Sequence, residues 1–311
     1  MSLDTAGPIA IARGVTAKFN NAQEAYNPIY NRFCATKQSD GRDEEYAFAG
    51  NAPGMTELRG SIQYARLLAA KFTLANREFV DGIEIPQVDF KDDRIGLYDD
   101  SAKDFGTAAA RHRDELLFYL INNAASLECW DGQNFVDTDH EWGDSGAQSN
   151  RLTYNIAGSS NDPTADECRA IVAAMLSAMC GFKRDNGTTF VGPVLQQLDG
   201  LVLLVPTFDL WQRFSAALYA ITVASGAQNY VVAKPAEVIC CPGMTAADKV
   251  RLIRTGTAYQ PFIYQDREAL RTWWNMSLAA NDPTLPYRLS AYARRNMGFY
   301  AWWNFVESQM T

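Results

Sequence analysis

Apolar residues between positions 61 and 90 alternate with polar ones, which is a pattern typical of β-strands. Tyr64, Leu68 and Phe72 fall on one side of a first run, and a second run rich in Val, Ile and Phe begins at residue 78. A short connection at residues 74–77 separates the two runs. The pattern therefore predicts a long β-hairpin over residues 61–90.

Apolar residues spaced by three and four predict three helices further along the chain. The first covers residues 98–125, about 39 Å at 1.5 Å per residue, and its charged residues, Asp114 among them, lie largely off the apolar stripe. The second begins after a capping box made by Thr164 and Glu167 and ends near Gly181. The third carries four apolar residues on one face, namely Leu210, Trp211, Phe214 and Leu218.

Strands are predicted mainly in the second half of the chain. Residues 201–205 form an apolar run ended by a proline, as in a buried strand. Further strands are expected at 231–233, 237–240, 258–264 and 287–294. Residues 129–163 are rich in Asp, Gly, Ser and Asn and predict a loop. Together these elements predict an α+β fold with mostly antiparallel strands.

The first 45 residues show no sustained period but carry four aromatic residues, Phe19, Tyr26, Tyr30 and Phe33. Such a segment does not fold alone, so we expect an arm that lies on something else. A hairpin with arms of about 14 residues would be about 45 Å long. A compact chain of this length has a radius of gyration of about 19 Å. The hairpin therefore packs either on its own domain or on neighbouring subunits, and the sequence leaves both open.

Aromatic residues gather near the end of the chain, at Phe299, Tyr300, Trp302, Trp303 and Phe305. This density is typical of core or interface packing rather than of a platform for stacking bases or sugars. The neighbouring pair Arg294 and Arg295 is too small for a nucleic-acid patch. We expect an ion pair or a solvated edge there.

The composition is that of an ordinary globular protein. The 311 residues are 47% hydrophobic and 21% charged, with a net charge of −8, which excludes disordered and fibrous classes and disfavours a sequence-reading DNA binder. No apolar stretch approaches the roughly 20 residues of a membrane helix, and the opening residues lack the pattern of a signal peptide. The six cysteines form no C-x-x-C pair and predict free, buried thiols.

Two motifs suggest catalysis or metal binding but do not support it. His112 and Ser145 lie in strings similar to those of trypsin-like proteases, yet His112 falls inside the predicted long helix and too few residues separate the two. The acidic residues at 131–144 faintly resemble a calcium loop, but Trp142 stands where a glycine is needed and Gln148 where a glutamate is needed. With only two histidines, a zinc site is not expected. No phosphate-binding motif is present in the sequence, so we expect no cofactor.

The run WDGQNFVDTDH at residues 130–140 resembles the signature of the Mu-like phage major head subunit family. Shorter stretches resemble the same family in the same order, from about residue 10 to 305. They include residues 45–50, 53–55, 71–79, 203–206 and 295–299. Val136 departs from the family where a second Phe is usual, and Glu141 where Pro is usual.

This resemblance implies the Hong Kong 97-type capsid fold. By order along the chain, residues 1–45 would be an N-terminal arm and 46–91 an extended hairpin. Residues 92–159 would carry the peripheral domain with its spine helix. Residues 160–256 would form the axial domain, and 257–311 would return to the peripheral domain and close the fold.

The implied function is structural rather than enzymatic: copies would form hexamers and pentamers of an icosahedral shell around double-stranded DNA, which is enclosed without sequence-specific binding. The shell would form in the bacterial cytoplasm and become part of the virion, with no membrane involved. Separate scaffold, protease and portal proteins are expected partners, and decoration proteins are a further candidate. A cage of the same fold that carries enzyme cargo is the first alternative. A cytosolic enzyme using the acidic loop at 131–144 is the second.

The resemblance also implies which residues act. Contacts with neighbouring subunits are expected from the hairpin through Tyr64, Arg66, Leu68, Phe72, Arg77 and Phe79. The arm would contribute contacts through Phe19, Tyr26, Tyr30 and Phe33. The family signature places Asp131, Gly132, Gln133, Phe135, Asp137, Asp139 and His140 in one loop, with no catalytic or metal-binding role.

Overall fold

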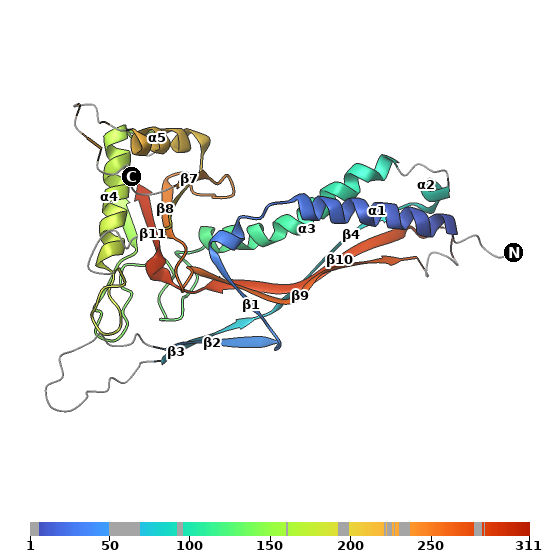
Figure 1. Ribbon diagram of the computed structural model, residues 1–311, viewed down its shortest axis with the longest axis horizontal. Coiled ribbons are helices and arrows are strands. Elements are labelled where there is room, and N and C mark those ends of the chain that lie inside the picture. The colour runs from blue at the N-terminus through green and yellow to red at the C-terminus, as the bar shows by residue number, and fades with distance from the viewer. Residues whose placement is uncertain are drawn as a thin grey trace.

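A long limb and an upright lobe make up the part of the chain that the computed structural model describes (Figure 1). The described residues are 6–49, 69–91, 96–159, 161–191, 199–220, 222, 226, 228–229, 237–276, 282 and 284–311. Each part has its own sheet, and the last strands of the chain pass from one sheet into the other.

The limb is a four-stranded sheet covered on one face by two helices (Figure 1). Helix α3, Gly96–Asn122, confirms the predicted long helix to within a few residues. Helix α1, Ala6–Ala25, lies beside it, and the short α2 covers Gln87–Lys91. In spatial order the strands are β1 (Cys34–Gln38), β9 (Phe262–Asn275), β10 (Tyr287–Phe299) and β4 (Arg77–Ile85).

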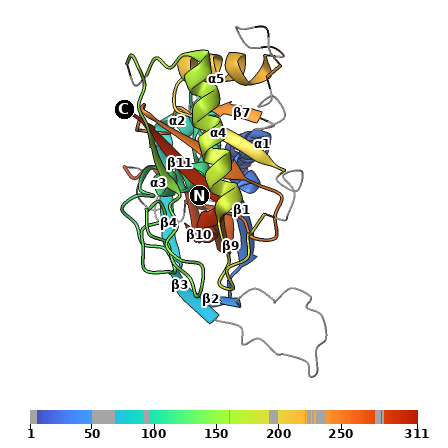
Figure 2. The same ribbon diagram turned by 90° about the vertical axis from the view of Figure 1, so that its left-hand side faces the viewer.

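The lobe is built on a five-stranded sheet. In spatial order its strands are β5 (Arg151–Tyr154), β11 (Phe305–Met310), β8 (Lys249–Arg254), β6 (Leu201–Val205) and β7 (Glu237–Cys240). Helix α4, Ala165–Gly181, packs against β11, and α5, Phe208–Tyr219, packs on α4 (Figure 2). The predicted capping box is present: Thr164 Oγ1 accepts from the Glu167 N–H at 3.3 Å, and Glu167 accepts from the Thr164 N–H at 2.8 Å.

The hairpin prediction is wrong about which strands pair with each other. Strand β3, Ala69–Ala75, pairs with β2, Asp43–Ala49, in an antiparallel ribbon. After Asn76 the chain continues as β4, which pairs with β10 rather than with β3. The expected turn at 74–77 is therefore a change of partner within one extended run. Alternation identifies a strand but not its neighbour, because the neighbour depends on contacts distant in sequence. The part of the prediction at residues 61–68 lies outside the described residues.

The ribbon, defined here as β2 and β3, turns its apolar side toward its own chain. Tyr46 donates its hydroxyl proton to Gln265 Oε1 at 2.9 Å, and the ring of Phe72 lies 6.2 Å from that of Tyr300. The outer face carries exposed residues, including Glu45 and Lys71, which form an ion pair at 3.1 Å. The described part of the ribbon thus finds apolar partners within the chain itself.

The N-terminal arm also folds onto its own chain, partly as a helix. Val15 and Phe19 of α1 are buried in a cluster with Ala102 and Phe105 of α3, and the Phe19 and Phe105 rings are 5.1 Å apart. The sequence shows no sustained period here because the apolar stripe of α1 is narrow and includes small alanines.

The remaining strand predictions have mixed outcomes. The strands at 201–205 and 237–240 are confirmed, whereas the strand predicted at 258–264 begins only at Phe262 and runs to Asn275. Strand β10 contains the predicted 287–294 and extends beyond it. The strand predicted at 231–233 lies outside the described residues. Five strands, β1, β2, β5, β8 and β11, were not anticipated because each is short or lies in a segment without clear alternation.

The predicted free thiols are confirmed. All six cysteines are free, and three of them, Cys34, Cys168 and Cys241, are buried. Burial raises the pKa of the Cys168 and Cys241 thiols to about 12. These side chains therefore act as small apolar residues rather than as nucleophiles.

The close approach of α1 to α3 generates a first prediction. A Cβ added at Gly106 would overlap the Phe19 carbonyl oxygen, whereas a Cβ added at Gly14 meets nothing within 4 Å. We expect Gly106→Ala to lower the free energy of unfolding by about 1–3 kcal/mol through overpacking. This loss occurs although alanine is the better helix former by about 1 kcal/mol. Urea denaturation followed by circular dichroism measures the change.

Gly14→Ala is the matched control on the facing helix. It should leave the free energy of unfolding unchanged or raise it by up to about 1 kcal/mol. An equal rise in the free energy of unfolding for Gly106→Ala and Gly14→Ala would show that α1 does not lie against α3 at this point.

Candidate functional site

The signature loop, defined here as residues 128–150, connects the region after α3 to β5 and therefore lies where the limb meets the lobe (Figure 1). It begins with a tight turn in which the Cys129 N–H donates to the Gln133 carbonyl at 2.7 Å. Gly132 has a φ of +82°, a conformation that residues with a Cβ rarely adopt. The turn therefore accounts for the glycine of the family signature.

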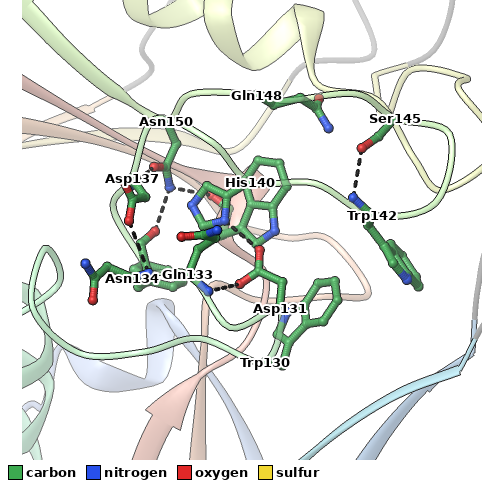
Figure 3. A network of polar contacts seen from close by, with 12 residues as sticks. Trp130, Asp131, Gln133, Asn134, Asp137, His140, Trp142, Ser145, Gln148 and Asn150 are labelled. Atoms are coloured by element: carbon green, nitrogen blue, oxygen red, sulfur yellow. Dashed lines mark hydrogen bonds and ion pairs between the residues drawn. The ribbon is translucent and has the colours of Figure 1, made fainter.

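His140 and Asp131 form a buried pair within this loop (Figure 3). Nδ1 of His140 lies 2.6 Å from Oδ2 of Asp131, and the two side chains are 0% and 2% exposed. The imidazole stacks on the indole of Trp302, with ring centroids 4.2 Å apart and planes 6° from parallel. The pair thus attaches the loop to the aromatic segment near the end of the chain.

Asn150 bonds two backbone groups of the loop and one of the segment before β11. Its Oδ1 accepts from the Asp137 N–H at 2.9 Å, and its Nδ2 donates to the Phe135 carbonyl at 2.8 Å and to the Trp302 carbonyl at 3.5 Å (Figure 3). Because Asn150 is fully buried, the Asp137 N–H and the Phe135 carbonyl would lack this partner without it, whereas the Trp302 carbonyl also accepts from the Phe305 N–H.

Asp137 closes a turn with its carboxylate. The carboxylate accepts from the Thr138 N–H at 2.8 Å and from the Asn134 N–H at 3.3 Å. Burial alone would raise the pKa of Asp137, but these two N–H groups, together with His140 and Asp139, outweigh it and hold the pKa below its ordinary value. Asp139, by contrast, is exposed.

Phe135 supplies the apolar part of the loop. Its ring stacks on Phe299 at 4.2 Å and 11° and lies 5.2–5.4 Å from the rings of Phe305 and Phe262. Trp130 adds a polar link by donating its indole proton to the Tyr300 carbonyl at 2.8 Å. The predicted role of the C-terminal aromatic cluster in core packing is confirmed, since Trp302, Trp303 and Phe305 are buried.

The arrangement is suited to holding segments together rather than to chemistry. His140 and Asp131 are too buried to reach a substrate. Ser145 interacts only within its own loop in the described structure, with Trp142 and Gly146, while His112 contacts Phe79 on the limb. Among the described residues no group of three or more His, Cys, Asp or Glu side chains could hold a metal ion. No helix in the described part of the chain is long and apolar enough to cross a membrane.

Three of the four aromatic residues predicted for arm contacts are buried within their own chain. Phe19 packs on Phe105, Tyr30 lies 4.9 Å from Tyr264, and Phe33 is completely buried. Phe19 and Phe33 are 0% and Tyr30 is 5% exposed, so these rings pack mainly within their own chain, and their contact with a neighbouring subunit stays a prediction.

The fourth, Tyr26, contacts Asp114, a residue whose role the sequence analysis did not identify. Its hydroxyl donates to Asp114 at 2.6 Å, and burial together with this carboxylate raises the pKa of Tyr26 to about 12. Asp114 is buried and also accepts from the Ile29 and Tyr30 N–H groups, at 3.1 and 2.9 Å. The carboxylate thus holds the arm against α3. A helical period could not reveal this, because the apolar stripe says nothing of backbone N–H groups from another segment.

The hairpin residues are placed in three ways. Tyr64, Arg66 and Leu68 lie outside the described residues. Phe72 is half-buried against its own chain. Arg77 is exposed and Phe79 half-buried, with the Arg77 guanidinium 5.9 Å from the centre of the Phe79 ring.

Sequence comparison gives the family. The family described as Mu-like prophage major head subunit gpT matches residues 9–170, slightly more than half of the chain. The chain is 32% identical over 114 residues to the "Mu-like prophage FluMu major head subunit" of Haemophilus influenzae. It is 32% identical over 111 residues to the "Major capsid protein" of Escherichia phage Mu. These alignments span 37% and 36% of the two relatives and the same shares of this chain.

Structural comparison gives the fold. The procapsid protein of bacteriophage JBD30 superposes with a TM-score of 0.54 at 18% identity, over 99% of this chain and 76% of that one. The capsid protein of cyanophage P-SCSP1u gives 0.59 at 10% identity, over 91% and 88%. The virus-like particle of Pyrococcus furiosus gives 0.54 at 8% identity, over 96% and 98%. The expected Hong Kong 97-type fold is confirmed.

The signature loop at residues 130–140 lies inside the matched range. Its glycine turn, its buried His140–Asp131 pair and its Phe135 contacts give the signature a structural purpose in joining the limb to the lobe. The sequence match and the fold agree, and the chain belongs to the Mu-like prophage major head subunit family.

Proposed function

We propose that this chain is the major capsid protein of a Mu-like phage or prophage. Copies assemble as hexamers and pentamers of an icosahedral shell, which encloses double-stranded DNA and becomes part of the virion. The observation that carries this proposal is the family match over residues 9–170. The role is structural and requires no catalytic residue.

The limb sheet supports assembly because, beyond the end that the ribbon contacts, the described residues leave part of its second face uncovered. Alternate residues of β10 face α3 and are buried, among them Leu289 and Ala291. On the opposite face, Val80 is 71% and Trp273 is 43% exposed. An apolar sheet face of this kind is suited to contact with a neighbouring copy.

The parts of the chain take their roles from this arrangement. We assign the limb to the peripheral domain, with α3 as the spine helix, and the lobe to the axial domain. The extended hairpin was expected at residues 46–91. We now limit it to β2, β3 and the residues that join them, because β4 pairs with β10 in the limb sheet. The arm at residues 1–45 lies along the limb through α1 and β1.

The partners we propose are other copies of the chain, scaffold, protease and portal proteins, and DNA held without sequence-specific contacts. A net charge of −8 is consistent with a shell that does not retain DNA during packaging. A solved capsid of bacteriophage JBD30 is described as decorated with minor capsid protein trimers, which supports decoration proteins as a further class of partner. The likeness to the Pyrococcus particle concerns the fold alone, so the family match favours a phage head over a cargo cage.

Arg77 provides a test of assembly. It is exposed at the point where the ribbon joins the limb sheet and forms no ion pair with another described residue, so its charge is available to a neighbouring copy. We expect the purified protein to form closed shells in negative-stain electron microscopy and Arg77→Glu to stop at small oligomers in sedimentation velocity. Reversing an exposed charge should leave the circular dichroism spectrum unchanged.

Arg77→Lys is the matched control, because it keeps the positive charge and should still form shells. Normal shells from Arg77→Glu would remove Arg77 from the proposed interface. A purified protein that remains monomeric under all assembly conditions would contradict the proposed function itself.

The signature loop provides a test of its joining role. We expect Asn150→Ala to lower the free energy of unfolding by about 1–3 kcal/mol, because buried backbone groups lose their partner. Urea denaturation below the assembly concentration measures this loss. Glu141→Ala, an exposed change in the same loop, should stay within about 0.5 kcal/mol of the unchanged protein. Equal stability of the two variants would show that Asn150 does not hold the loop.

A further inference from the structure

The limb contains a pocket that includes no residue of the signature loop. It lies between α3 and strands β4, β9 and β10 and has a volume of about 270 Å³. Its walls are apolar for the most part, with Phe79, Phe105, Leu270 and Ala293 among them. Three side chains that can donate hydrogen bonds, Arg111, His112 and Arg295, also line it, and Arg111 is already paired with Glu115.

Arg295 is buried without a counter-charge. The residue is 4% exposed, its Nε is buried without a hydrogen bond, and no ion pair joins its guanidinium to a described residue. This corrects the expectation of an ion pair or a solvated edge for Arg295. The expectation holds for Arg294, which points to the other face of β10 and lies 3.7 Å from Glu78. Burying a charge without a counter-charge is unfavourable, so the protein is expected to supply it with a partner.

Elsewhere the chain provides such partners. Arg251 is buried to a similar degree in the lobe sheet, and Glu307 accepts from its Nε at 3.0 Å. Lys249 completes that group at 2.7 Å from Glu307. Of these two buried arginines, Arg251 has a counter-charge and Arg295 has none among the described residues.

His112 adds a second unpartnered group to the same pocket. Its Nδ1 is buried without a hydrogen bond, and its ring lies edge-on to Phe79 at 4.3 Å. Burial, and then the positive charge of Arg295, lower the pKa of His112. A negative charge placed between the two side chains would relieve the repulsion and accept hydrogen bonds from both.

The other charges near Arg295 do not fill this role. Asp266, which lies opposite Arg295 on β9, is half-buried and forms no ion pair with it in the described structure. Glu115 is paired with Arg111 at 2.8 Å, and both are exposed. Asp81 is exposed and accepts from the Gly82 N–H at 2.8 Å. The Arg77 guanidinium lies 5.9 Å from the centre of the Phe79 ring, so it adds positive rather than negative charge close to the pocket.

We propose that this pocket binds one oxyanionic group, a carboxylate, sulfate or phosphate, through Arg295 and His112. Guanidinium groups match the paired oxygens of such anions and bind them through charge-assisted hydrogen bonds. The group comes either from a free inorganic anion or from a carboxylate side chain of a second copy. The second source rests on the proposed assembly into a shell.

Isothermal titration of the dissociated protein with sodium sulfate, at constant ionic strength, tests the pocket directly. We expect one site, and we expect Arg295→Met to weaken sulfate binding about ten-fold or more. Arg288→Gln is the matched control, because Arg288 lies on the same strand but is exposed and paired with Glu84. It should bind sulfate as the unchanged protein does.

A second variant and a second measurement guard against effects on folding. His112→Phe keeps a ring against Phe79 and should weaken sulfate binding without loss of the fold. In buffer without oxyanions, Arg295→Met should melt at a higher temperature than the unchanged protein, since it removes an unpaired buried charge. Sulfate should then raise the melting temperature of the unchanged protein and not that of Arg295→Met.

Assembled shells distinguish the two sources. If a carboxylate of a second copy occupies the pocket, sulfate binds to dissociated subunits but not to shells, whereas a free anion site binds sulfate in both. Absence of sulfate binding to the dissociated protein, or equal binding by Arg295→Met, would overturn the proposal. Either result would leave the proposed shell function standing, because that function is tested by particle formation.

Discussion

The contact between the signature loop and the end of the chain is the interaction on which the two-part structure depends. Strand β10 belongs to the limb sheet and β11 to the lobe sheet, and only the short segment at 300–304 separates them. Phe135 fills the space among aromatic rings from both sheets, while His140 stacks on Trp302. Because apolar contacts and buried hydrogen bonds coincide at this point, movement of the limb relative to the lobe would disrupt both.

Buried polar groups specify the rest of the arrangement. Asp114 accepts backbone N–H groups of the arm and fixes its path along α3. Glu307 pairs with Arg251 and Lys249 inside the lobe sheet and sets the register between β8 and β11. Such groups are costly to bury alone, so each restricts the chain to the conformation in which its partner is present.

The ribbon is an extended element that packs on its own chain. Tyr46 and Phe72 hold its apolar side against the body, so its described part needs no neighbour for burial. Under the proposed function, its outer side and the part of the limb sheet left uncovered by described residues would be the surfaces that meet other copies. A subunit of this kind can fold before it assembles, because its apolar contacts are made within one chain.

The sequence by itself determined the long helix α3, the capped helix α4, the buried strand at 201–205 and the presence of a loop after α3. Each is encoded by local spacing or by a short motif such as Thr164 with Glu167. Only the tertiary structure decided that β3 pairs with β2 while β4 pairs with β10, that Phe19 and Phe33 are internal, and that Asp114 and Arg295 are buried. These features depend on which distant segments meet, and local periodicity records the type of an element without identifying the residues across from it.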